Sequence, residues 1–147
     1  MEFVDASRVL TPRGWSGPCR VWTDGGLIVG VDDIDSAPER TLSPGFVDLQ
    51  VNGIDTIDVA TADGDDWAAL DSALLRQGTT SWCPTVISAP MESYGPCLDR
   101  IGIAMRRGGA TVRPQMLGVH LEGPFLGGAP GAHRKDRLRP IDLEFLA

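Results

Sequence analysis

Residues 117 to 125 read L-G-V-H-L-E-G-P-F, and the interpretation of the whole chain starts from them. The apolar run from Met116 to Leu121 predicts a β-strand. Glu122 follows at the carboxyl end of that strand, which is where parallel sheets place their functional side chains. A hard carboxylate there suits zinc or another divalent ion. Glu122 is therefore a candidate metal ligand, and the alternative is a loop carboxylate that caps nearby backbone N–H groups.

The sequence before this strand alternates strand-like and helix-like segments. An apolar run predicts a strand over residues 46 to 51 that is buried on both sides. A second strand is predicted over 79 to 87, and Pro84 is expected to mark its end because proline cannot donate to a strand ladder. Helices are predicted over 66 to 77 and over about 93 to 107. This β-α-β-α-β order implies right-handed crossovers and a parallel sheet.

The N-terminal part of the chain has a different pattern. Residues 1 to 43 read as short strands broken by turns, and Asp24-Gly25-Gly26 is a hairpin signal between two apolar runs. The pattern changes at Ser43-Pro44-Gly45. We therefore expect two parts, residues 1 to 43 and residues 44 to 147.

Composition narrows the function classes. With 42% apolar and 22% charged residues, the chain is typical of a soluble globular protein. A net charge of −7 argues against nucleic acid or an anionic membrane as a partner. No apolar run approaches the roughly 20 residues of a membrane span, and the first residues do not resemble a signal peptide. The three cysteines suggest no disulfide framework. We expect a cytoplasmic protein.

Four segments together resemble one enzyme family. They read P-G-F-V-D-L-Q-V-N-G at 44 to 53, G-T-T-S-W-C-P-T at 78 to 85, L-G-V-H-L-E-G-P-F-L at 117 to 126, and G-A-H at 131 to 133. In this order they are similar to the N-acetylglucosamine-6-phosphate deacetylases of the amidohydrolase superfamily. The first segment alone indicates only the superfamily, whereas H-L-E-G-P-F followed by G-A-H is more specific to the deacetylases.

The resemblance implies an α/β fold. Residues 44 to 147 would form the first three β/α units of a TIM-like (β/α)8 barrel, preceded at 1 to 43 by part of a small β-sandwich. A complete barrel needs roughly 250 residues. The final segment, 139 to 147, reads as a helix that stops after about two turns. We therefore expect the chain to be truncated at its C-terminus.

The resemblance also implies a reaction. The family hydrolyses the acetamide of N-acetylglucosamine 6-phosphate to glucosamine 6-phosphate and acetate. One divalent metal ion, with zinc the leading candidate, activates water and the amide carbonyl, and a carboxylate carries the proton to the leaving amine. The implied partner is a small amino-sugar phosphate, and the full-length protein is expected to be a homodimer.

The same resemblance assigns roles to individual residues. Glu122 matches the metal-binding glutamate, and His133 matches a histidine placed near the sugar, with an ordinary loop histidine as the alternative. Gln50 and Asn52 stand where many amidohydrolases carry an H-x-H metal pair. Because amides are poor ligands for such ions, we interpret them as neighbours of a single-metal site; the alternative is that they only satisfy hydrogen bonds at the barrel mouth. His120 is expected to be structural rather than a ligand.

Two features limit this interpretation. Residues 54 to 58 depart from the glycine- and aromatic-rich turn that the family often has after the first strand, which leaves the sugar open. The two later metal-binding histidines and the catalytic aspartate are absent from these 147 residues, so no catalytic base is assigned and the chain alone is expected to be inactive. The alternatives are another amidohydrolase, such as a dihydroorotase- or D-aminoacylase-like enzyme, and a non-catalytic remnant that acts as a binding module.

Overall fold

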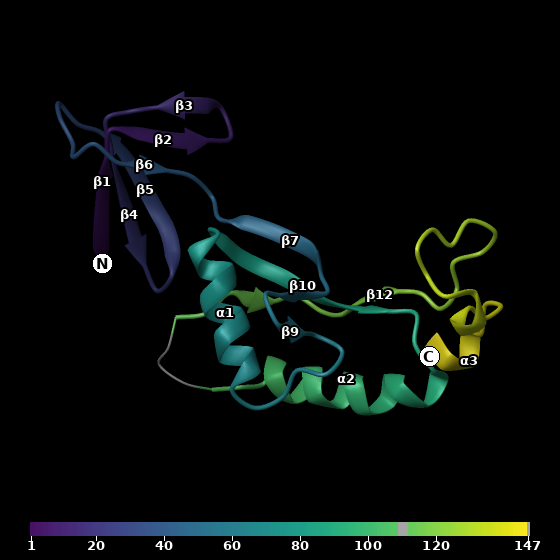
Figure 1. Cartoon of the computed structure of the whole chain (residues 1–147). Helices are drawn as coiled ribbons and strands as arrows, with labels where there is room; N and C mark the ends of the chain where they lie inside the picture. The colour runs from purple at the N-terminus through teal and green to yellow at the C-terminus, as the bar shows by residue number, and fades with distance from the viewer. Residues whose placement is uncertain (109–111, 147) are drawn as a thin grey trace. The chain divides into compact units, whose positions relative to one another are not determined.

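The computed structural model describes residues 1–108 and 112–146 (Figure 1). It is a mixed α/β structure that divides into two compact units, Met1–Pro44 and Gly45–Ala147. No helix in the described part of the chain is long and apolar enough to cross a membrane.

The first unit consists of two small sheets. One sheet is antiparallel and has the strand order β1-β4-β5, and in the other β2 pairs antiparallel with β3 and parallel with β6. The strands are β1 (Glu2–Ala6), β2 (Arg8–Thr11), β3 (Gly14–Ser16), β4 (Cys19–Asp24), β5 (Leu27–Asp33) and β6 (Thr41–Leu42). The predicted hairpin is confirmed: Gly25 and Gly26, both with positive φ, form the turn between β4 and β5, as a type I′ turn requires.

The second unit is built around one central strand. The central strand is β10 (Thr79–Ile87), and β7 (Phe46–Val51) pairs with its residues 79–84. Strand β11 (Gln115–Met116) pairs with residues 81–82 of β10, and β12 (His120–Glu122) pairs with residues 85–87. All of these pairings are parallel, as the β-α-β-α-β order predicts. The remaining elements are a hairpin of β8 (Gly53–Ile54) and β9 (Ile57–Asp58), the helices α1 (Asp66–Arg76), α2 (Met91–Met105) and α3 (Leu143–Leu146), and the 3-10 turn η1 (Lys135–Arg137).

The core of this unit lies between β10 and the helices α1 and α2 (Figure 1). Every second residue of β10 points to the helices, and Trp82 and Val86 on that face are fully buried. Helix α1 contributes the apolar residues on one face that its helical periodicity predicts, and α2 contributes buried residues at helical spacing. The helix residues in this core are Trp67, Leu70, Leu74, Tyr94, Cys97, Ile101 and Ala104.

Three predictions about the strands are wrong in detail. Pro84 lies inside β10 rather than at its end; the register with β7 shifts between Trp82 and Pro84, and such an irregularity tolerates a residue without an N–H donor. Strand β7 is not buried on both sides, because Phe46 is 68% exposed and Leu49 61% exposed. The third strand is interrupted after Met116 and extends through Glu122, which therefore belongs to the strand.

A largely buried ion pair ties α1 to Arg107, the second residue after α2. Asp71 is 6% exposed, and its Oδ2 accepts a hydrogen bond from Arg107 at 2.9 Å. Burial raises the pKa of Asp71, and the charge of Arg107 acts in the opposite direction. A carboxyl whose pKa is higher in the folded chain favours folding below its unfolded pKa, and this contribution is lost as the pH rises through the folded pKa.

We therefore expect Arg107→Met to destabilise the protein in a pH-dependent way. At about pH 7.5 the variant leaves Asp71 buried and charged without its partner, at a cost of about 1–3 kcal/mol in the free energy of unfolding. At about pH 4.5 the cost is smaller because Asp71 takes up a proton. Urea unfolding at both pH values measures the difference, with the exposed Arg106→Met as the control. An equal loss at both pH values contradicts the prediction.

Candidate active site

The candidate site lies at the carboxyl ends of the parallel strands. Gln50 is the penultimate residue of β7, and Glu122 is the last residue of β12, where it pairs with Ile87 at the end of β10. His133 comes from the loop between β12 and η1, and this loop continues beyond the same end of β12 (Figure 1). Parallel pairing thus brings together residues that are far apart in the sequence.

Both carboxylate oxygens of Glu122 have a partner. Gln50 donates from Nε2 to Oε2 at 2.8 Å, and His133 Nε2 lies 3.2 Å from Oε1. The pKa of Glu122 lies below its ordinary value chiefly because of the hydrogen bond with His133; Asn52 and Gln50 contribute in the same direction, whereas burial acts against them. Glu122 is therefore ionised at neutral pH, as a metal ligand must be.

Three of the four site residues predicted from the sequence thus make direct hydrogen-bonded contacts, and Asn52 acts on the same carboxylate. His120 is directed elsewhere, with its Nδ1 3.3 Å from the hydroxyl of Thr85. The assigned roles of Glu122 as a ligand and His133 as a substrate contact remain predictions.

Two residues of the site were not predicted. Ser88, directly after β10, places its Oγ 2.8 Å from His133 Nδ1. Gly123 packs against Ser88 so closely that a Cβ there would lie 2.3 Å from that same Oγ. A signal for Ser88 existed, because it lies where a predicted parallel strand ends, but no spacing or motif singles it out.

The described residues do not by themselves form a metal site. Within 1–108 and 112–146, no group of three or more His, Cys, Asp or Glu side chains is arranged to hold an ion. An ionised, 29% exposed carboxylate at a strand end fits the role of one ligand. Any further ligands would have to come from other residues.

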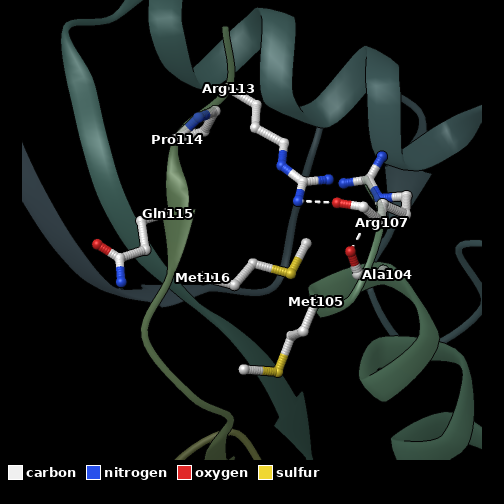
Figure 2. A pocket seen from close by; sticks show the side chains of 7 residues that line it. All are labelled: Ala104, Met105, Arg107, Arg113, Pro114, Gln115 and Met116. Carbon is white, nitrogen blue, oxygen red and sulfur yellow. Dashed lines mark hydrogen bonds between the residues drawn. The ribbon is translucent and has the colours of Figure 1, made fainter. Parts of the chain in front are cut away.

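A separate pocket lies near the start of β11 and contains none of these residues (Figure 2). It encloses about 290 Å³, and Met105 and Met116 line it together with two arginines. Arg107 is engaged with Asp71 and the Ala104 carbonyl, and Arg113 donates to the Arg107 carbonyl. The guanidinium groups of this pocket therefore hold the chain's own backbone and carboxylates together.

Comparison with known proteins gives the class of this chain. No protein-family model matches it. N-acetylgalactosamine-6-phosphate deacetylase from Escherichia coli O157:H7 is 33% identical over 147 residues, which cover 97% of this chain and 38% of that protein. N-acetylglucosamine-6-phosphate deacetylase from Bos taurus is 32% identical over 139 residues, 84% of this chain and 33% of that protein. The crystal structure of N-acetylglucosamine-6-phosphate deacetylase from Thermotoga maritima superposes with a TM-score of 0.84 at 28% identity, covering 99% of this chain and 39% of that one.

By sequence and by fold, the chain is a relative of the amino-sugar-phosphate deacetylases, which are enzymes. In particular, it is similar to an N-terminal portion of N-acetylglucosamine-6-phosphate deacetylase. The chain spans 33% to 39% of the length of these three proteins.

Proposed function

We propose that the chain forms the N-terminal part of a metal-dependent enzyme that hydrolyses the acetamide of N-acetylglucosamine 6-phosphate. The products are glucosamine 6-phosphate and acetate. The observation that supports this most is the ionised Glu122 held between Gln50 and His133 at the ends of parallel strands, in a chain whose relatives are deacetylases. In this proposal residues 44–147 belong to a β/α barrel and residues 1–43 to a small β-sandwich. The full-length protein is a cytoplasmic homodimer.

Each residue of the site has a task in this reaction. Glu122 would be one ligand of a divalent ion, zinc in the first instance, and the bound ion would supply Lewis-acid activation of the amide carbonyl and of water. Gln50 orients the carboxylate of Glu122 through its 2.8 Å hydrogen bond, and Asn52 helps to keep that carboxylate ionised. His133 contacts the substrate with its imidazole. The general base and the other metal ligands belong to parts of the enzyme outside residues 1–147.

The identity of the sugar is the second question. The relative from Escherichia coli that matches nearly the whole chain is named for N-acetylgalactosamine 6-phosphate, which differs from the glucosamine compound only in the configuration at C4. N-acetylgalactosamine 6-phosphate is therefore the second candidate substrate. The ratio of kcat/KM for the two sugar phosphates decides between them.

Acetate release by the full-length protein that contains residues 1–147 tests the proposed function. We expect turnover of one of the two sugar phosphates, loss of turnover after dialysis against a chelator, and recovery when zinc is added back. The polypeptide 1–147 alone is expected to show no turnover, because its two histidines and Glu122 do not complete a ligand set. Turnover only of a cyclic ureide or an N-acyl-D-amino acid would favour another amidohydrolase, and inactivity of the metal-loaded full-length protein on every amide would favour a binding module.

A further inference from the structure

His133 is held on both sides of its ring. Its Nδ1 lies 2.8 Å from Ser88 Oγ and its Nε2 3.2 Å from Glu122 Oε1, and its side chain is only 12% exposed. An ionised carboxylate can only accept a hydrogen bond, whereas a hydroxyl can donate or accept. In a neutral ring the proton must therefore be on Nε2, facing Glu122, and Nδ1 must accept from Ser88.

The position of the Ser88 hydroxyl is fixed by its surroundings. The Tyr94 hydroxyl, on a side chain that is 1% exposed, donates to the Ile87 carbonyl and accepts from the Ala89 N–H, both at 3.3 Å. These two contacts hold the backbone on either side of Ser88. Gly123 has a φ of +109° and leaves open the space that the hydroxyl occupies.

We propose that Ser88 is a positioning residue for His133: its hydroxyl donates to Nδ1 and, together with the Glu122 carboxylate on the other side of the ring, holds the Nε2–H tautomer and the orientation of the ring. The space left by Gly123 and the two hydrogen bonds of the Tyr94 hydroxyl keep the Ser88 hydroxyl in place for this contact. Without the hydroxyl, Nδ1 loses this donor, and the preference for the Nε2–H form and for this ring orientation then depends on Glu122 alone.

The positioning of His133 by Ser88 does not depend on the proposed function. Only its expected effect on catalysis rests on that function. In the structure the Nε2–H faces Glu122. If Glu122 binds the metal ion in the full-length enzyme, the same Nε2–H would be available as a hydrogen-bond donor to an acceptor oxygen of the substrate. The other tautomer would present a lone pair to that oxygen and repel it. Ser88 then acts on substrate binding through His133, without touching the substrate.

The tautomer itself is the first test. The full-length protein is labelled with ¹⁵N-histidine, freed of metal and studied by NMR at about pH 8.5, well above the ordinary histidine pKa of about 6.5. The His133 signals are those that disappear in His133→Gln. We expect Nε2 to carry the proton, and the ratio of the Nε2–H to the Nδ1–H form to fall about tenfold in Ser88→Ala. Ser88→Thr, which keeps the hydroxyl, should restore the ratio, and Ser81→Ala, within β10, should leave it unchanged.

A protonated Nδ1 in the unmutated protein, or an unchanged ratio in a folded Ser88→Ala variant, overturns the proposal. Kinetics of the metal-loaded protein give the second readout. We expect Ser88→Ala to lower kcat/KM about tenfold, mainly through KM, and Ser88→Thr to remain within about twofold. If kcat falls and KM stays constant, the positioning role in substrate binding is wrong. If the unmutated protein shows no deacetylation, the proposed function fails, whereas the spectrum still decides the role of Ser88.

Discussion

Replacement of Glu122 by glutamine in the full-length protein is expected to lower the rate of acetate release by more than about a hundredfold. Residues that only support a metal ligand typically cost 10- to 100-fold in affinity or activity, so the loss of a ligand should exceed that range. Glutamine keeps the shape of the side chain but removes the charge that Gln50 and His133 stabilise. Metal content by elemental analysis and acetate release are measured on the same preparation, and both should fall.

The matched control is Glu39→Gln, which makes the same change at an exposed position in the first unit. It should leave metal content and rate unchanged. Circular dichroism of both variants shows whether the fold is kept. If Glu122→Gln is folded, retains stoichiometric metal and deacetylates at the normal rate, Glu122 is not a ligand, and its carboxylate has a local structural role.

The sequence allowed the parallel part of the fold to be predicted closely. The strands expected over 46–51 and 79–87 have these bounds in the structure, and the first helix ends one residue earlier than expected. These elements have strong local signals, since helical period and β-branched runs alternate and glycines end them. The second helix spans Met91–Met105 and so begins and ends two residues before the expected bounds; Pro90, with an extended ψ of 139°, lies just outside its first turn.

The predictions that were wrong concern features that depend on contacts between distant segments of the chain. The expectation for Pro84 assumed regular pairing, and the shifted register between β7 and β10 removes that constraint. The interruption of the third strand follows from how it meets β10, where Leu117 donates to the Trp82 carbonyl between the two short pairings. A register shift of this kind depends on both strands of the pair, so the local sequence of one strand does not determine it.

The contacts in the candidate site were likewise predicted only in part. The meeting of Gln50 with Glu122 follows from parallel strands whose carboxyl ends share one edge, and the sequence supports that expectation. The approach of His133 depends on a loop, and its role was suggested only by family resemblance. Ser88 was missed because a serine after a strand is common, and only the three-dimensional contact with Nδ1 distinguishes it.

Trp82→Ala is expected to destabilise the second unit by about 3–5 kcal/mol, because Trp82 is fully buried at the centre of its core. A loss of that size is a large fraction of the stability of a typical domain. Trp82 also lies on the strand that carries Thr85 and ends next to Ser88, so the damage should reach the candidate site. Urea unfolding followed by circular dichroism measures the change.

Trp82→Phe separates two contributions to this effect. The Nε1–H of Trp82 is buried and has no hydrogen-bond partner among residues 1–108 and 112–146, and such a group costs about 1–3 kcal/mol. Phenylalanine loses packing volume but also removes that unpaired donor, so we expect a net loss below about 1.5 kcal/mol. If Trp82→Phe is as destabilising as Trp82→Ala, the indole N–H has a partner in solution, such as a buried water, and the core depends on that hydrogen bond as well as on packing.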